Sequence, residues 1–360
     1  MGDAVIEQIA ALKDQDWAVR EDAAIALGAL RDARAVGPLI SLLRDSDRAV
    51  REAAIGSLKA LGEASVVALG VCLVDSELAV QEAASAILSV TADERVLCPL
   101  LTVLKSPDWI VRMHAAKALG HLKKTEAVDA LIPLLQDKVK AVREETSTAL
   151  AAIGDAAIPS LSAALSHTEW LVRLHAVEAL GKTRSSSAVE PLLSTLFNDS
   201  DAAVREDTVR ALGQIGDTKA IDFLLVVMKE PGLRPLAVES LGQIGDRRAV
   251  PVLIKVLAGT DRPEVSREVN GCGDRWDEEM TTRCAAVRAL GQIGDVSAVP
   301  VLIDAMRQTM TRADSAMALV RFGEVVVAPL LTMLSRESDD NIRYHIHETL
   351  AKVGWRPGRV

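Results

Sequence analysis

The segment DQDWAVREDAAIALGALRD, residues 14–32, decides the fold, because its pattern returns in DSDRAVREAAIGSLKALGE, residues 45–63. Each copy places acidic residues in a turn, then Val-Arg, then an alanine-rich run, and LGQIGD closes three later copies, at 212–217, 241–246 and 290–295. Successive copies are 29–32 residues apart, except for one spacing of 49 residues. Aligning them puts these residues in one register: Arg20, Arg51, Gln81, Arg112, Arg143, Arg173, Arg205, Arg234, Arg283, Arg312 and Arg343.

Each copy contains two helical patterns. Apolar residues recur at helical spacing in ARAVGPLISLLRD (33–45) and again in RAVREAAIGSLKALG (48–62). The aspartate four residues before the arginine, as at Asp16, suits a helix N-cap and is also placed to pair with the arginine one turn later. A lone hairpin cannot bury its apolar face, whereas stacked hairpins can. We therefore predict an all-α fold, a right-handed α-solenoid of about eleven helical hairpins.

Composition narrows the class of protein. Hydrophobic residues make up 49% of the 360 residues, aromatic residues only 2%, and the formal net charge is −9. This mixture excludes a disordered chain, which would be poor in aliphatic residues, and an all-β chain, which would be rich in aromatic residues. The negative charge argues against nucleic acid as a partner. No apolar run is long enough to span a membrane, and the N-terminus lacks the pattern of a signal peptide, so we expect no membrane partner.

The four cysteines point to a reducing compartment. Cys72 and Cys98 lie in apolar helical runs, where a free cysteine behaves as a small core residue. Cys272 and Cys284 are twelve residues apart without a nearby histidine, and no CxxC spacing occurs, so we expect neither disulfides nor a metal site. The expected location is the cytoplasm.

The repeats resemble HEAT repeats of the phycobilisome-lyase type. The resemblance rests on V-R-x-x-A-x-x-A-L-G-x-I-G-D followed by A-V-x-P-L-I-x-x-L, and it runs from about residue 3 to residue 354 apart from one insertion. It implies a stack in which the second helix of each hairpin lines a concave face. It also implies a wide choice of roles, since repeats of this type serve lyases, chaperones and adaptors.

The one long spacing divides the predicted array. Residues 1–258 would hold eight repeats and the first helix of the ninth, residues 259–277 a charged insertion loop, residues 278–354 the remaining repeats, and residues 355–360 a C-terminal tail. The insertion is either a binding loop, for which Trp276 is the candidate residue, or a tolerated surface lengthening. The last helical pattern is either a polar cap or followed by more chain in the native protein.

Two copies depart from the acidic pattern that follows the register arginines. The fourth copy reads WIVRMHAAKALGH and the sixth WLVRLHAVEALG, so both place Trp, an apolar residue and His where most copies carry acids. Trp109, Met113 and Lys117 stand at i, i+4 and i+8 on one helical face. The alternative is that each tryptophan only covers the edge of a neighbouring helix. The predicted partner-binding residues of this acidic groove are Trp17, Trp109, Met113, His114, Lys117, Trp170, Leu174, His175 and Glu178.

These features favour a non-enzymatic scaffold or adaptor. Tryptophan and methionine are frequent at protein interfaces, and an acidic groove would suit a protein partner with a basic or apolar segment. No GxSxG, P-loop or HExxH motif is present, so we predict no catalytic residue, metal or cofactor. The alternative function, implied by the resemblance, is a bilin lyase or a chaperone for chromophore attachment. The sequence leaves the oligomeric state open.

Overall fold

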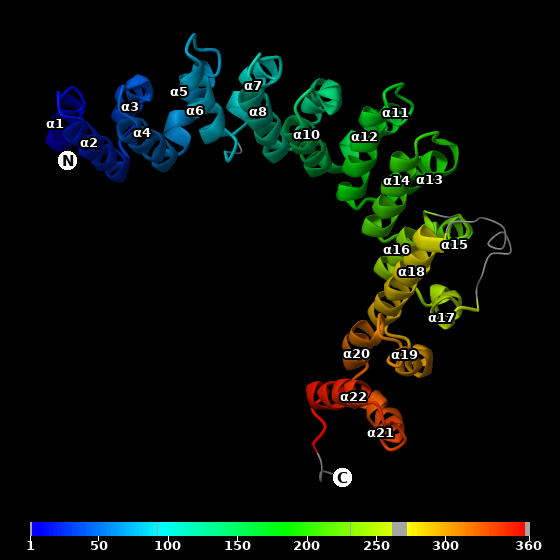
Figure 1. The fold of residues 1–360 in the computed structure, drawn as a ribbon. Coiled ribbons are helices and arrows are strands. Elements are labelled where there is room, and N and C mark those ends of the chain that lie inside the picture. The colour runs from blue at the N-terminus through cyan, green and yellow to red at the C-terminus, as the bar shows by residue number, and fades with distance from the viewer. Residues whose placement is uncertain (1, 92, 231, 261–271, 357–360) are drawn as a thin grey trace. The chain divides into compact units, whose positions relative to one another are not determined.

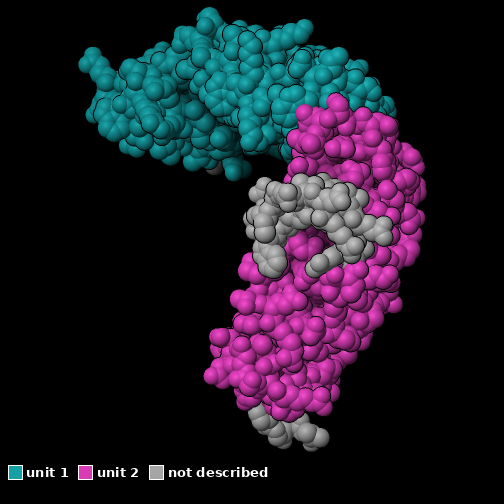
Figure 2. Space-filling model, turned by 45° about the vertical axis from the view of Figure 1, so that its right-hand side comes forward, with its two compact units in different colours: residues 1–183 teal, residues 184–360 magenta. Residues whose placement is uncertain are grey.

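The computed structural model describes residues 2–91, 93–230, 232–260 and 272–356. Every regular element within these ranges is an α-helix or a short 3-10 helix, and none is a strand. The chain divides into two compact units, unit 1 (residues 1–183) and unit 2 (residues 184–360), which Figure 2 shows in separate colours. The all-α prediction is therefore confirmed.

Unit 1 is a stack of six helical hairpins in two layers. In Figure 1 the first helices α3, α5, α7 and α11 lie along one side of the unit and the second helices along the other. The first helices are α1 (Gly2–Ala11), α3 (Val36–Ser41), α5 (Glu63–Cys72), α7 (Leu97–Val103), α9 (Val128–Leu131) and α11 (Ile158–Ala164). The second helices are α2 (Trp17–Leu30), α4 (Arg48–Leu61), α6 (Leu78–Leu88), α8 (Trp109–Leu122), α10 (Lys140–Ile153) and α12 (Trp170–Thr183).

Unit 2 continues the same pattern with five hairpins. Its first helices are α13 (Val189–Asn198), α15 (Ile221–Val227), α17 (Val250–Ala258), α19 (Val299–Ala305) and α21 (Val327–Leu334). Its second helices are α14 (Ala202–Ile215), α16 (Arg234–Ile244), α18 (Cys272–Ile293), α20 (Arg312–Val320) and α22 (Asp340–Lys352). The described hairpins of the two units therefore match the eleven predicted from the repeat.

The second helices begin where the capping aspartates predicted. The side chains of Asp16, Asp47 and Asp108 accept hydrogen bonds from backbone N–H groups two residues further on, at 3.0, 2.8 and 2.8 Å. Each aspartate has an extended backbone, as an N-cap requires. The caps satisfy amides that the first helical turn leaves without an intrahelical acceptor.

Two register arginines, Arg20 and Arg112, tie one hairpin to the next, and neither pairs with the cap residue of its own helix. Arg20 donates Nε and Nη2 to the two carboxylate oxygens of Asp45, both at 2.8 Å, and Arg112 binds Asp137 in the same way at 2.7 and 2.9 Å. Nη1 of each arginine donates to two carbonyl groups just before its own helix. The predicted pairing of Arg20 with Asp16 is therefore wrong, because the side chain turns back toward these carbonyls and across to the next turn.

Small residues set how closely the second helices approach. A Cβ atom built on Gly120 of α8 would lie 2.7 Å from the Cα atom of Ala149 in α10, which is closer than real Cβ atoms come. Ala115, Ala116 and Ala118 of α8 are fully buried. The alanine-rich runs of the repeat thus form the helix contacts of the stack, while leucine and valine fill the core behind them.

The ninth repeat differs from its predicted boundaries. Helix α18 begins at Cys272, so residues 272–277 of the predicted loop are helical. The run DRWDEEM that follows Gly273 contains no glycine or proline, and the second helix extends backward through it. Residues 261–271 of the predicted insertion lie outside the described residues, and so does the side chain of Trp276.

Two further properties bear on function. Among the helices of the described ranges, none combines the length and apolarity that crossing a bilayer requires. In the same ranges, no three His, Cys, Asp or Glu side chains are grouped so that they could hold a metal ion.

Candidate functional site

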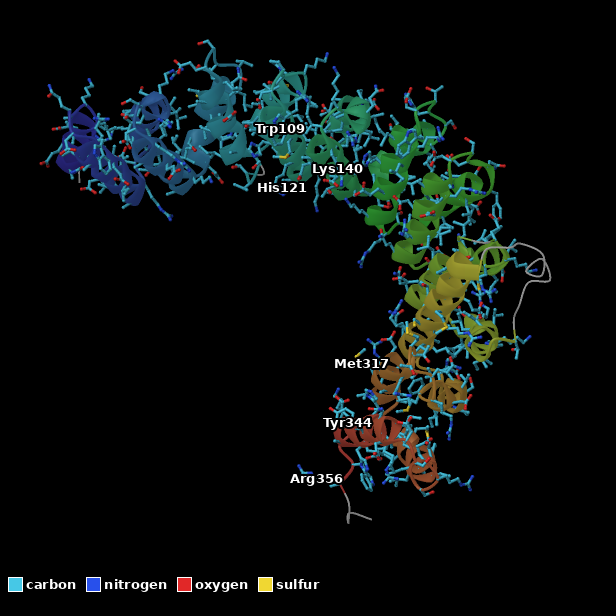
Figure 3. The ribbon with its side chains drawn as sticks, viewed as in Figure 1. Trp109, His121, Lys140, Met317, Tyr344 and Arg356 are labelled. Atoms are coloured by element: carbon cyan, nitrogen blue, oxygen red, sulfur yellow. The ribbon has the colours of Figure 1, made fainter. Side chains whose placement is uncertain are left out.

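The first turns of the second helices in unit 1 carry a row of exposed side chains. Trp17, Trp109 and Trp170 are the first residues of α2, α8 and α12, and they are 48%, 40% and 42% exposed. Figure 3 labels Trp109 at the start of α8 and Lys140 at the start of α10. The shared register holds because each tryptophan directly follows the capping position of its helix. Large apolar side chains thus stand in solvent at repeated positions of one stack.

The helices between the tryptophans carry basic or aliphatic residues at the same position. Arg48 begins α4, Leu78 begins α6 and Lys140 begins α10, and all three are exposed. Arg48 pairs with Glu52 at 2.7 Å, and Lys140 pairs with Glu144 at 3.3 Å. These pairs are highly exposed and contribute little to stability. Together with the tryptophans they form a row that we call the first-turn row.

Two helices continue the first-turn row with apolar residues one turn further on. Met113 of α8 and Leu174 of α12 are half-buried, and each lies four residues after its tryptophan. Lys117, a further turn along α8, is also half-buried. The equivalent position in α2 is the acidic residue Glu21. The predicted combination of Trp and an apolar neighbour therefore exists on α8 and α12, whereas Trp17 has an acidic neighbour.

His114 is only partly available to a partner. The residue is half-buried, and its Nδ1 atom lies 3.2 Å from the hydroxyl oxygen of Ser85 on the neighbouring helix α6. Burial lowers the pKa of His114, and the positive charge of Lys117 lowers it further. The imidazole is therefore held neutral and hydrogen-bonded between α6 and α8.

His175 is not on the surface, and its prediction as a partner-binding residue is wrong. The side chain is buried, and Nε of Arg143 donates a hydrogen bond to its Nε2 at 3.0 Å. Because an arginine Nε–H can only donate, Nε2 is the acceptor and the ring proton lies on Nδ1. Nδ1 is 2.9 Å from a carboxylate oxygen of Glu178. The histidine bridges α10 and α12 from inside the stack.

Glu178 belongs to the same internal network. Its second carboxylate oxygen accepts from Nζ of Lys182 at 2.8 Å, and Lys182 also donates to Thr148 of α10 at 3.0 Å. Burial acts to raise the pKa of Glu178, but the hydrogen bonds from His175 and Lys182 outweigh it and hold the pKa at about 2. Two side chains of its own helix hold the carboxylate, and its role in partner binding stays a prediction.

A difference in sequence explains why this network exists. Arg20 and Arg112 find their carboxylates at Asp45 and Asp137, in the turn that leads to the next second helix. The corresponding residue for Arg143 is His167, whose Nδ1 accepts from the backbone N–H of Glu169. Arg143 therefore bonds to His175 in place of a carboxylate. A histidine where the repeat carries aspartate was the available signal in the sequence.

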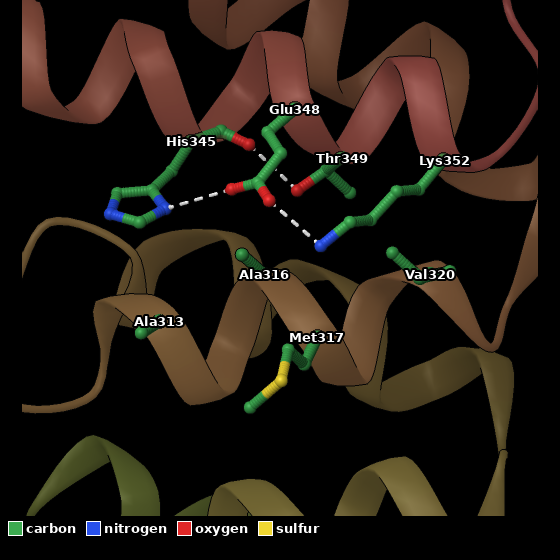
Figure 4. A pocket seen from close by; sticks show the side chains of 8 residues that line it. All are labelled: Ala313, Ala316, Met317, Val320, His345, Glu348, Thr349 and Lys352. Carbon is green, nitrogen blue, oxygen red and sulfur yellow. Dashed lines mark hydrogen bonds and ion pairs between the residues drawn. The ribbon is translucent and has the colours of Figure 1, made fainter.

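Unit 2 contains a pocket that sequence reasoning missed. It lies between α20 and α22 and has a volume of about 190 Å³ (Figure 4). The α20 wall is apolar or small and the α22 wall is polar. The pocket is lined by Ala313, Ala316, Met317, Val320, His345, Glu348, Thr349 and Lys352.

The comparison with known families decides what the repeats are. The sequence pattern of HEAT repeats matches residues 7–89, 97–168, 158–232 and 275–353, which is most of the chain. This chain is a HEAT-repeat protein. A PBS lyase HEAT-like repeat also matches residues 236–259, so the resemblance predicted from V-R-x-x-A-x-x-A-L-G-x-I-G-D is confirmed.

Solved structures resemble the HEAT-repeat protein in fold. Yeast importin-beta (Kap95p) is 14% identical over 98% of this chain and 57% of its own, with a TM-score of 0.63. Kap121p is 13% identical over 98% of this chain and 46% of its own, also with a TM-score of 0.63. The protein thus spans about half the length of these helical-repeat chains. No curated protein shows a significant sequence match to it.

Proposed function

We propose that this HEAT-repeat protein is a non-enzymatic scaffold that holds a partner protein on the second helices of unit 1. The observation that carries the proposal is the exposure of three tryptophans in one register of the repeat. A folded protein rarely keeps such large apolar side chains in solvent at repeated positions unless another surface covers them. Trp and Met are enriched among the residues that dominate binding energy at protein interfaces.

Two patches would provide most of the affinity. The first consists of Trp109, Met113 and Lys117 on α8, and the second of Trp170 and Leu174 on α12. The acidic residues that flank them would attract and orient a basic segment of the partner, which affects association rate more than affinity. We also propose that the protein works in the cytoplasm. The relatives in fold support a protein partner only in general terms, since one of them was solved as a Kap95:Nup1 complex.

The test compares what wild-type and variant proteins capture from the native host. We expect the affinity of the double variant Trp109→Ala/Trp170→Ala for the partner to fall at least about tenfold, because truncating a hot-spot residue costs about 2 kcal/mol or more. Trp17→Ala is the matched control. It removes an equally exposed tryptophan that has an acidic neighbour, so its effect should be smaller.

Two results would overturn the proposal. One is capture of the same proteins at equal yield by wild type and double variant, with both folded by circular dichroism. The other is stable visible absorbance of an added bilin on the purified protein, which would favour the lyase alternative instead.

A further inference from the structure

The outer face of the second helices in unit 1 changes its charge along the helices. Three positions form this face, one, five and nine residues after the register residue of each repeat, because residues four apart lie on one side of a helix. Among α2, α4, α6, α8 and α10, the first position carries a glutamate in every helix except α8. The second and third positions, which we call the far half of the face, carry no acid: Ile25 and Ala29, Gly56 and Ala60, Ala86 and Val90, Lys117 and His121, Thr148 and Ala152.

Two lysines give the far half its positive charge. Lys117 is half-buried on α8, one turn before His121, which Figure 3 labels at the opposite end of this helix from Trp109. Lys59 is exposed in the last turn of α4, next to Ala60. Helix α6 packs against both α4 and α8, so it lies between the two lysines. Neither lysine has an ion pair in the part of the chain that the structure describes.

Both lysines act on one imidazole beside α6. His114 of α8 is half-buried, with Nδ1 at 3.2 Å from the hydroxyl oxygen of Ser85 on α6. Burial lowers the pKa of His114 most, and the charges of Lys117 and Lys59 lower it further. Asp108 acts in the opposite direction and is outweighed. Positive charges from α4 and α8 therefore meet at α6.

Acids elsewhere on these hairpins leave the two lysines unpaired. Glu94, after α6, pairs with Lys124 at 2.5 Å. Glu63, after α4, lies beside Arg95, whose Nη2 donates to its backbone carbonyl at 3.3 Å. Glu82 of α6 stands at the first position of the face, and within the described ranges it forms no ion pair with either lysine. The face therefore has an acidic end and a basic end.

The surface between the two lysines is apolar and low. Val90, just after α6, is 62% exposed, while Gly56, Ala60 and Ala86 are small. A Cβ atom built on Gly56 would have no neighbour within 4 Å. An aliphatic side chain of a partner can therefore lie on Val90 with an ammonium group on either side. This combination suits a peptide segment that carries acidic residues next to an aliphatic one.

We propose that the partner segment held on unit 1 is charge-segregated. Its basic end lies at the glutamates that follow the first-turn row, and its acidic end lies on Lys59 and Lys117 with an aliphatic residue on Val90. The inference rests on the proposed function, because it specifies the charges of the same partner. Complementary charges at both ends fix the direction of the segment, since a reversed segment would bring like charges together.

The test is a titration of the full chain, labelled with ¹³C at its valine and methionine methyl groups, with two synthetic peptides. The segregated peptide has lysines at one end, leucines in the middle and glutamates at the other end, and the lysine peptide has lysines at both ends. We expect the segregated peptide to shift the Val90 resonance, assigned with Val90→Ala, to saturation. Val71 of α5 is the internal control because it is 70% exposed on a first helix.

The ratio of the two peptide affinities tests the lysines. In Lys59→Glu/Lys117→Glu the ratio should move at least about tenfold toward the lysine peptide, because two attractions become repulsions. Lys13→Glu/Lys105→Glu makes the same change in net charge at exposed residues that follow the first helices α1 and α7. This control should leave the ratio unchanged, which separates a local contact from the overall charge of the chain.

Three results would overturn the inference. They are a Val90 resonance that moves no more than that of Val71, an equal change of the ratio in both double variants, and a thymidine oligonucleotide that shifts Val90 at a lower concentration than the segregated peptide. Circular dichroism of each variant separates a lost site from a lost fold.

The methyl resonance of Met113 distinguishes failure of this inference from failure of the proposed function. A shift of Met113 without one of Val90 would keep the first-turn row as a binding surface and remove the acidic end of the segment. A shift of Val90 without one of Met113 would contradict the proposed function instead.

Discussion

Two neighbouring helix contacts of unit 1, which we call joints, each use the register arginine of the repeat, but the two arginines bind different partners. Between α8 and α10, Arg112 forms a bidentate ion pair with Asp137. Between α10 and α12, Arg143 donates to the neutral imidazole of His175. The difference teaches that the two histidine-containing copies are not equivalent. The histidine of α12 is part of the scaffold, whereas the tryptophan that begins the same helix remains on the surface.

The largest expected effect comes from removing the arginine at each joint. Arg112→Met leaves the largely buried carboxylate of Asp137 without its ion pair, whereas Arg143→Met leaves only a neutral imidazole. Both variants lose the same kind of carbonyl contacts. We expect a local loss of about 1.5–3 kcal/mol for Arg112→Met and about 0.5–1.5 kcal/mol for Arg143→Met.

Hydrogen exchange of the amides in α8, α10 and α12 measures the free energy of local opening at each joint. A local measurement is needed because a chain of two units does not have to unfold in a single transition. Equal losses of local stability in the two variants would show that the carboxylate and the imidazole are equivalent partners, which would contradict the difference between the joints.

A smaller effect should appear in acid at the contact between α10 and α12. The pKa of Glu178 is held at about 2, below its ordinary value of 4.5. A group with a lowered folded-state pKa stabilises the fold above its ordinary pKa and loses that contribution as pH falls toward the lowered value. Protection of α12 should therefore decline between about pH 4.5 and pH 2.

Glu178→Gln removes the titrating carboxylate and should flatten this acid dependence at α12. The acid dependence at the Asp137 joint should persist. Burial acts to raise the pKa of Asp137, but the hydrogen bonds from Arg112 outweigh it, so the pKa is lowered there too. An unchanged acid profile of α12 in Glu178→Gln would contradict the assignment of the carboxylate to this network.

The smallest expected effect is a gain. His167→Asp restores the carboxylate that the repeat places in this turn and offers Arg143 the ion pair that Arg112 has. Because His175 already satisfies Nε of Arg143, the gain should not exceed about 1 kcal/mol. In the double variant His167→Asp/His175→Ala, the new aspartate should compensate for part of the loss that His175→Ala causes alone. No compensation would mean that residue 167 cannot reach Arg143.

The fold was predictable because the same sequence pattern recurs in every repeat. The capping aspartates, the helical spacing and the alanine-rich contacts each recur, so an error in one copy is corrected by the others. The exposed position of Trp109 and Trp170 also followed from register. The start of α18 did not, because the insertion interrupts the repeat and helix-forming residues there extend the helix.

The candidate sites also contain features that followed from the repeat and features that did not. His114 and His175 stand at equivalent positions in the sequence, yet one contacts Ser85 and the other accepts from Arg143. Those partners lie about thirty residues away, as the intervals of 29 and 32 residues show. Periodicity within one helix cannot specify a contact that another repeat supplies.

The sequence by itself determined that the chain folds into stacked HEAT hairpins and where the second helices with a capping aspartate begin. Caps and apolar periodicity are local properties, so they can be read from a single copy. Only the tertiary structure decided that His175 is buried, that Glu178 is engaged and that small residues on α20 open a pocket against α22. Burial and cavities depend on the side chains that neighbouring hairpins place against a residue, and packing creates those neighbours.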